Sequence, residues 1–359
     1  MELNLSAEVL NAYGYTEDNT IITEVGTGLI NHTYLISPKG GHKKYILQQI
    51  NVNVFKNPWA IANNIKAISD YLAKEFPDYY FIKPITTKDG LEMAVVNGEY
   101  WRMLPFVNDT VSLDVLTEPE QAYEAAKQFG KLSMLLNNFD ASILEPTIPG
   151  FHDLNLRFDQ FSQALLDTSK EQKGKAKPQI DDALEHKYIL DYFKSYAKRT
   201  DFPDRVMHHD TKISNVLLDG KTFKGVCVID LDTIMPGKFI SDLGDMMRTY
   251  LCAFSENEPD LSKVKIRIPY FEAMIKGYLS EMKNSLTATE KELILFSGKY
   301  IIYMQALRFL TDFLNGSTYY PTSYEMQNLD RTKNQFKLLS ELFENEKILQ
   351  DIIEQNLIH

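Results

Sequence analysis

The sequence predicts an α+β protein with two lobes, a small β-rich lobe followed by a larger, mainly helical one. Strand-like runs separated by glycine turns fill residues 19–107, whereas helical spacing of apolar residues dominates after about residue 110. The length of 359 residues suits two lobes better than one small domain. We therefore expect residues 1–106 to form the first lobe and residues 107–359 the second, with a ligand site between them.

The first lobe is predicted to be a sheet accompanied by one long helix. A short helix is expected at the N-terminus. Apolar alternation and glycine turns predict strands within 19–28, 29–37, 44–50 and 100–107. Asn57-Pro58 has the composition of a helix start, and apolar residues at helical spacing continue to about Glu75.

The second lobe is predicted to be helical except for one strand-rich stretch at 205–230. Thr117 and Glu120 have the spacing of a capping box, which predicts a helix to about residue 137. Thr287 and Glu290 repeat that spacing. Further helices are expected at 154–167, 181–198, 263–284, 289–315 and 328–356, and the lysine-rich stretch 171–178 is expected to be a loop.

Composition argues against several classes of function. The formal net charge is −11, whereas nucleic-acid-binding proteins usually present a basic face, so we expect no nucleic-acid partner. No stretch approaches the ~18 apolar residues needed to cross a bilayer, and no signal peptide is recognised. Cys227 and Cys252 lie in apolar segments without metal-ligand spacing, which favours a cytoplasmic protein. We expect no membrane association and a monomer.

The densest chemistry lies in residues 208–215, HHDTKISN, and in Asp230, which follows an apolar strand. Phosphoryl transfer from ATP requires a carboxylate near the acceptor hydroxyl and oxygen ligands for Mg²⁺. The loop can bring Asp210 to the acceptor and Asn215 to the metal, and the returning strand can place Asp230 beside them. The spacing therefore predicts a kinase in which Asp210 is the catalytic carboxylate and Asn215 and Asp230 bind magnesium.

Neighbouring polar residues leave alternatives open. Adjacent histidines point in different directions and lack a third ligand, so His208 is expected to brace the loop and not to bind a metal. Asp232 could support the first metal ion or bind a second one. Asp242 could cap a helix or hold the catalytic loop. Upstream, Gly26 and Gly28 join two predicted strands, where a Gly-x-Gly turn either brings backbone N–H groups to phosphate or is only a turn.

Six segments resemble one family over nearly the whole chain. They are GTGLINHTYL, KYILQQIN, HHDTKISNVLLD, IDLDTIMPG, DLSKV and RFLTDFL. They resemble the bacterial N-acetylhexosamine 1-kinases, which lie within the aminoglycoside phosphotransferase and choline-kinase-like superfamily. The resemblance implies a bilobal, protein-kinase-like fold and phosphorylation of the anomeric hydroxyl of N-acetylglucosamine or N-acetylgalactosamine, using ATP and Mg²⁺. It implies the roles given above for Asp210, Asn215 and Asp230.

The resemblance also implies nucleotide contacts, with one departure. The segment 102–107, which includes Arg102, Leu104 and Phe106, would meet adenine. Kinases of this type usually carry Lys or Arg on the third strand, paired with Glu on the following helix, but this chain has Gln48 and no Glu in the first half of that helix. Gln48 can hydrogen-bond a phosphate but supplies no charge, so we expect magnesium and the glycine loop to carry more of the neutralisation.

The sugar site is expected near Arg308, Asp312 and Tyr319, which combine polar groups with an aromatic wall. By resemblance, Arg308 and Tyr319 lie near the sugar, although Arg308 and Asp312 are four positions apart and could simply pair on one helix. Tyr319 could equally be a surface aromatic. Two rival functions stay open. One is a kinase for another small alcohol, such as homoserine, choline, methylthioribose or an aminoglycoside; the other is a nucleotide-binding pseudokinase scaffold, which only Gln48 supports.

Overall fold

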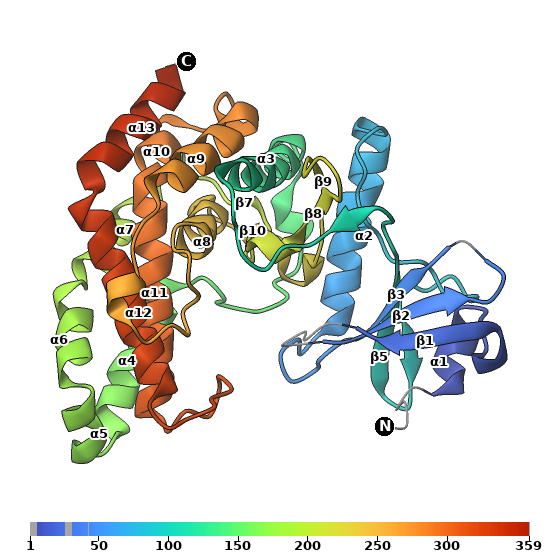
Figure 1. Ribbon diagram of the computed structural model, residues 1–359, viewed down its shortest axis with the longest axis horizontal. Coiled ribbons are helices and arrows are strands. Elements are labelled where there is room, and N and C mark those ends of the chain that lie inside the picture. The colour runs from blue at the N-terminus through green and yellow to red at the C-terminus, as the bar shows by residue number, and fades with distance from the viewer. Residues whose placement is uncertain (1–5, 26–30, 42, 359) are drawn as a thin grey trace.

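The computed structural model describes residues 6–25, 31–41 and 43–358, and it confirms the α+β, two-lobe arrangement. The first lobe is built on an antiparallel sheet with the strand order β1-β2-β3-β5-β4. Its elements are α1 (Ala7–Ala12), β1 (Thr20–Glu24), β2 (His32–Pro38), β3 (Tyr45–Gln49), β4 (Ala94–Val96) and β5 (Glu99–Pro105). Figure 1 shows this sheet at one end of the molecule and the long helices at the other.

The two faces of the sheet differ in character because side chains alternate along each strand. Tyr34, Leu47 and Met103 are register partners on β2, β3 and β5, and all three are buried in a core that α1 covers with Leu10. The residues next to them on these strands, such as Gln48, therefore point to the opposite face. That polar face carries Gln48 and Arg102, with Ile46 and Leu104 beside them, and it lines one cavity together with residues of the second lobe.

Helix α2 (Pro58–Glu75) stands between the sheet and the second lobe (Figure 1). Its apolar face, which includes Ile61 and Ile65, packs into the large core of the second lobe. Asn64 is buried on the same helix, and its Nδ2 donates to the backbone oxygens of Glu145 (2.7 Å) and Ile234 (2.9 Å). The helix is thus tied to the second lobe by both apolar packing and hydrogen bonds.

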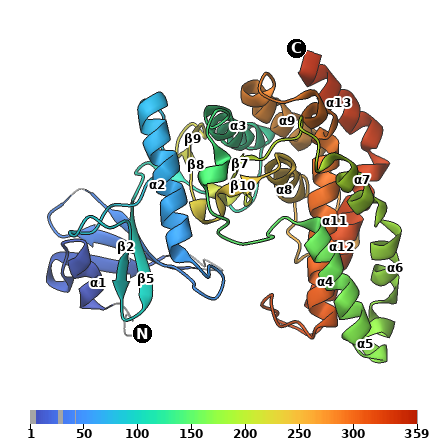
Figure 2. The ribbon, with the colours of Figure 1, turned by 180° about the vertical axis from the view of Figure 1, so that it is seen from behind.

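The second lobe is a helical body seen from both sides in Figures 1 and 2. Its helices are α3 (Pro119–Leu135), α4 (Leu154–Asp167), α5 (Lys170–Lys175), α6 (Lys177–Glu185), α7 (Tyr188–Tyr196), α8 (Ile240–Tyr250), α9 (Ile268–Met282), α10 (Ala288–Glu292), α11 (Ile294–Leu314), α12 (Gln327–Glu344) and α13 (Glu346–Ile358). Helix α11 is buried along most of its length and packs against α4, α8 and α12. None of the helices in the described chain combines the length and apolar character that crossing a membrane requires.

Local sequence signals gave mixed results for these helices. The capping box formed by Thr287 and Glu290 is confirmed at the start of α10. The capping box expected at Thr117 is wrong, because α3 begins at Pro119 and Glu118 is in the capping position. The side chain of Gln121 accepts the backbone N–H of Thr117 and of Glu118. The lysine-rich stretch 171–178 is also not a loop but forms parts of α5 and α6.

Short strands of the second lobe frame the loop that contains Asp210. They are β6 (Thr110–Val111), β7 (Arg205–Met207), β8 (Val216–Asp219), β9 (Gly225–Val228) and β10 (Met235–Gly237). Strand β6 pairs with β8, and β8 with β9, whereas β7 pairs with β10. The chain therefore passes from one lobe to the other between Pro105 and Thr110. Segment 208–215 connects β7 to β8, and segment 229–234 connects β9 to β10.

Candidate active site

Two carboxylates of α8 hold the loop 208–215 in place. Asp242 accepts the backbone N–H of His208 (2.9 Å) and of His209 (2.7 Å), and Asp245 accepts that of Thr211 (2.8 Å). His209 has φ 66°, a left-handed conformation that a non-glycine residue adopts only where its surroundings hold it. Of the two roles open for Asp242, the structure shows the second, since α8 begins before it and its carboxylate holds the loop.

Burial makes these carboxylates costly to ionise. Burial raises the pKa of Asp242 to about 6, although the two backbone N–H groups oppose the shift. Burial also raises the pKa of Asp245, while Arg248, whose Nη2 lies 2.9 Å from Asp245 Oδ1, works in the opposite direction. Arg248 is itself shared with Glu256 at 2.7 Å. The loop 208–215 is therefore held by a network of charged side chains, and such a network makes a loop rigid only when its members are paired.

Asp210 lies at the centre of the loop, and its carboxylate is engaged on one oxygen. Its Oδ2 accepts hydrogen bonds from Lys212 Nζ (2.7 Å) and Asn215 Nδ2 (3.0 Å). Burial alone would raise the pKa of Asp210, but the charge and hydrogen bond of Lys212 outweigh it and lower the pKa. Asp210 is thus held in its ionised form, and its role as the catalytic carboxylate stays a prediction.

Asp230 reaches the same place from the end of β9. It has φ 58°, and the backbone N–H of Ile229, just before it, donates to the carbonyl oxygen of Asn215 (2.9 Å). His208 braces this junction as expected, because its Nε2 bonds the carbonyl oxygen of Ile229 (2.9 Å). Desolvation by the surrounding protein, together with the charges of Asp232 and Asp210, raises the pKa of Asp230 to about 7. The loop carboxylate, its amide neighbour and the strand-end carboxylate thus share one electronegative site, in which Asn215 is buried, Asp210 is half-buried and Asp230 is exposed.

This site fits Mg²⁺ held together with a nucleotide. Within the described ranges, no group of three His, Cys, Asp or Glu side chains is arranged to hold a metal ion. Mg²⁺ bound with nucleotide uses only one or two protein ligands, the remaining positions being phosphate oxygens and water. Because Nδ2 of Asn215 donates to Asp210, the amide carbonyl oxygen of Asn215 is the atom left to act as a ligand beside Asp230.

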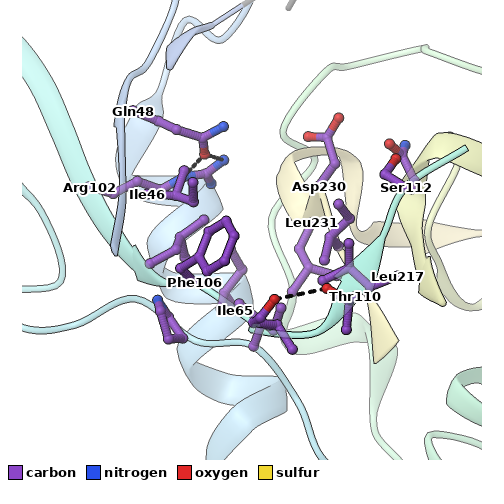
Figure 3. Close-up of a pocket in the computed structure, with 16 residues that line it drawn as sticks. Ile46, Gln48, Ile65, Arg102, Phe106, Thr110, Ser112, Leu217, Asp230 and Leu231 are labelled. Atoms are coloured by element: carbon purple, nitrogen blue, oxygen red, sulfur yellow. Dashed lines mark hydrogen bonds between the residues drawn. The ribbon is translucent and has the colours of Figure 1, made fainter. Parts of the chain in front are cut away.

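A cavity of about 390 Å³ opens from Asn215 and Asp230 toward the sheet of the first lobe. Figure 3 shows Phe106 and Ile65 at its apolar end and Gln48 and Asp230 at its polar end. Leu104 also lines it. The size and the division into apolar and polar ends suit a nucleotide, and the contact of its base with Leu104 and Phe106 stays a prediction. Gly26 and Gly28 lie outside the described residues, and their contact with phosphate stays a prediction.

Arg102, which we expected near adenine, has a different position. Its side chain lies on the polar face of the sheet, where it contacts Gln48 and forms an ion pair with Asp232. Sequence reasoning missed this pair because nothing local connects β5 to the segment after β9. Asp232 is occupied by this contact and by Asn31, whose Nδ2 donates to it at 2.7 Å.

A second cavity, of about 560 Å³, contains the residues expected at the sugar site. Its lining joins α4, α11 and the loop after α11 to Asn53 of the first lobe. Arg308 does not pair with Asp312; it donates to Gln305 (3.2 Å) and lies over the ring of Phe151, with 5.2 Å from Cζ to the ring centroid. The ring of Phe151 also lies 6.4 Å from that of His209, next to Asp210. The ring of Phe151 therefore lies between Arg308 and the loop 208–215.

The loop after α11 is shaped by Asp312. Its carboxylate accepts the backbone N–H groups of Thr318 (3.0 Å), Tyr319 (2.9 Å) and Tyr320 (2.9 Å), and Nδ2 of Asn328 (2.8 Å). Asp312 is thus a support for the loop that presents Tyr319, whose side chain is 64% exposed. We missed Arg157, which lines the same cavity from α4, because nothing in its local sequence distinguishes it from a solvent-exposed helical arginine.

Solved structures of small-molecule kinases have the same fold. A spectinomycin phosphotransferase in complex with ADP and spectinomycin matches with a TM-score of 0.61 and 14% identity, over 96% of this chain and 100% of that one. A microcompartment-associated aminopropanol kinase matches with 0.59 and 16%, over 95% and 97%. A Plasmodium vivax ethanolamine kinase matches with 0.58 and 16%, over 92% and 85%.

Likeness at such identities concerns the fold, and the sequence itself indicates the family. The profile described as "Phosphotransferase enzyme family" (APH) matches residues 21–266, which is more than half of the chain and includes Asp210, Asn215 and Asp230. The chain therefore belongs to the APH phosphotransferase family.

Proposed function

We propose that the protein transfers the γ-phosphate of ATP to the anomeric hydroxyl of N-acetylglucosamine or N-acetylgalactosamine and gives the sugar 1-phosphate. Membership of the APH family makes the protein a phosphotransferase, and its structural neighbours include kinases that act on small molecules bearing alcohol groups. A sugar acceptor is supported by the resemblance of the sequence segments to the hexosamine kinases and by the chemistry of the 560 Å³ cavity.

The observation that carries the proposal is the surplus of hydrogen-bond donors in this cavity. Two guanidinium groups line it, from Arg157 and Arg308. Within the described chain, Arg157 Nε and Thr311 Oγ1 are buried without a hydrogen-bond partner, and buried polar atoms normally have one. The buried carboxylate of the cavity, Asp312, is already fully hydrogen-bonded. Asp167 also lines the cavity, but its carboxylate is exposed and accepts Gln163 Nε2 (2.8 Å). A neutral ligand rich in hydroxyl and amide oxygens suits this lining, whereas a ligand ammonium group would have to compete with the two guanidinium groups for these carboxylates.

The geometry of Asp210 supports a role as proton acceptor. Lys212 and Asn215 both bind Oδ2, so we assign Oδ1 to the C1 hydroxyl of the sugar. Asp210 orients this hydroxyl and accepts its proton as the oxygen attacks the γ-phosphorus in line. Arg308 and Tyr319 hold the sugar ring against the aromatic side of the cavity.

Asn215 and Asp230 complete the site from the nucleotide side. When bound to these two residues, Mg²⁺ would offset the negative charge of the phosphates. Leu104 and Phe106 enclose the base, and Gly26 and Gly28 are assigned to the phosphates through their backbone N–H groups. The spectinomycin phosphotransferase of the same fold was solved with ADP, which supports a nucleotide in this cleft.

The proposal is tested by measuring ATP consumption with a panel of acceptors and identifying the product by phosphorus NMR. N-acetylglucosamine and N-acetylgalactosamine are expected to be turned over and to give a sugar 1-phosphate, whereas glucosamine, which carries an ammonium group, is expected to be poor. Preferential turnover of choline, ethanolamine, homoserine or an aminoglycoside would refute the sugar assignment. Asp210→Asn is expected to lower kcat by at least ~100-fold while ADP still binds.

A further inference from the structure

The polar face of the first-lobe sheet holds one buried arginine, and two neighbouring strands position it. Thr33, Gln48 and Arg102 are register partners on β2, β3 and β5, so their side chains share one face. Gln48 Nε2 donates to Thr33 Oγ1 (3.2 Å), which turns its Oε1 toward Arg102. That oxygen then accepts from Arg102 Nε (3.0 Å) and Nη2 (2.8 Å). One edge of the guanidinium is thereby fixed to the sheet.

The other edge of the guanidinium crosses to the second lobe. Nη1 of Arg102 pairs with Asp232, and each of the two side chains is 3% exposed. Asp232 follows Asp230 by two residues, and Arg102 lines the same cavity as Asn215 and Asp230. The Nη1 end of this permanently charged, rigid donor group, paired with Asp232, therefore lies at the same cavity as the two residues proposed to bind the metal, Asn215 and Asp230.

We propose that Arg102 is the cation that binds the nucleotide phosphates in this protein, in place of the lysine that similar kinases carry on the third strand. β3 presents Gln48 there, which contributes an oxygen that holds Arg102 and no charge. Asp232 pairs with Nη1 while the phosphates are absent, and the phosphates compete with it for this donor. The inference rests on the proposed binding of ATP and is independent of which acceptor is used.

The Arg102–Asp232 pair has a second possible role that the experiment must distinguish from phosphate binding. The Arg102–Asp232 pair joins the two lobes, so it could act only as a structural tie. A structural tie would affect the binding of any ligand in the cleft equally, because it acts through the position of the lobes. An arginine that binds the phosphates affects the affinity only of molecules that contain phosphate.

The experiment compares ADP with adenosine, in the presence of Mg²⁺, by isothermal titration calorimetry. Arg102→Met keeps much of the apolar stem and removes the charge. We expect it to weaken ADP by at least ~10-fold, since charge-assisted bidentate contacts are among the strong ones, and to change adenosine by less than ~3-fold. Equal losses for both ligands, or an ADP affinity within ~3-fold of the wild type, would overturn the proposal. A wild type that binds neither ligand would instead refute the proposed function.

Two further variants sharpen the test. Gln48→Lys combined with Arg102→Met returns the charge to β3 and is expected to restore much of the ADP affinity. Arg102→Lys keeps the positive charge but lacks the planar guanidinium with its several donors, so it is expected to lower the affinity for ADP partly and to leave that for adenosine unchanged. This variant tests the proposal even if Arg102→Met does not fold. Arg205→Met is the matched control, since the side chain of Arg205 is only 11% exposed and pairs with Glu290 at 2.6 Å outside the cavity. It is expected to lower Tm without a selective loss of ADP.

Discussion

Replacing Asp242 by asparagine separates the positioning of the catalytic loop from the stability of the fold. The carboxylate of Asp242 accepts two backbone N–H groups, from His208 and His209, and it is buried. The amide of asparagine offers one oxygen, and its NH₂ group would face the second N–H. Asp242→Asn therefore removes one charge-assisted hydrogen bond from the residue that holds His209 in its left-handed conformation.

Two opposing contributions decide the effect on stability. The lost hydrogen bond to a charged group costs about 1.5–3 kcal/mol. Against this, the pKa of Asp242 is about 6 in the folded protein, so keeping the group ionised at pH 7 costs folding about 3 kcal/mol relative to its usual pKa near 3.8, and asparagine avoids this cost. The two nearly cancel. Activity has no such compensation, because a shift of Asp210 by about 1 Å can lower the rate ~100-fold.

We therefore expect Asp242→Asn to lower kcat by ~100-fold, with little change in Tm at pH 7. Because the pKa of Asp242 is raised in the folded protein, its contribution to the free energy of unfolding is greatest below its unfolded pKa and is lost as the pH rises through 6. The wild type should therefore gain stability relative to the variant when the pH is lowered. Asp260→Asn, which alters an exposed carboxylate that accepts Ser262, is the control and should leave kcat unchanged. A kcat of Asp242→Asn within ~3-fold of the wild type would show that the loop does not depend on this carboxylate.

Three other predictions follow from the same region. Lys212→Met should raise the pKa of Asp210, and the acid limb of the pH profile of kcat/KM should move to higher pH; an unmoved limb would separate Lys212 from Asp210. Gly244→Ala should cost about 3 kcal/mol in urea unfolding, because the added Cβ would lie 2.2 Å from the carbonyl oxygen of Ser297 where α8 crosses α11. Burial lowers the pKa of His209 to about 4, so the neutral ring contributes fully to the free energy of unfolding only above its unfolded pKa of 6.5. This contribution is smaller by about 2 kcal/mol at pH 5. The loss of stability between pH 7 and 5 should thus be smaller in His209→Asn, and an equal loss would contradict this account.

Local signals predicted much of the catalytic loop, because its parts are close in sequence. Asp210 and Asn215 belong to one short loop, and Asp230 returns on the next hairpin, so their spacing alone indicated a shared site. The helix boundaries were less certain. Ser169 accepts the N–H of Gln172 and starts a helix within the stretch that we expected to be a loop, and a single cap of this kind is a weak signal against glycine and proline nearby.

The acceptor cavity and the cation of the nucleotide site could not be predicted in this way. Arg157 and Arg308 share a cavity only because α4 packs beside α11, and no periodicity in either helix indicates that contact. Arg102 meets Asp232 only because the two lobes dock at this point. Such contacts depend on the packing of distant elements, which short patterns do not encode.

The absence of a lysine on β3 is therefore weak support for a pseudokinase. Gln48 and Arg102 are directly paired across β3 and β5, and adjacent strands lie only about 4.8 Å apart. Moving the cation from one strand to its register partner keeps it on the same face of the sheet, and the longer arginine side chain can span the difference. Gln48, which stands where similar kinases carry the lysine, then has a role in positioning, because its amide oxygen holds the guanidinium of Arg102. A motif can thus disappear from the sequence while the charge it supplied stays at the site.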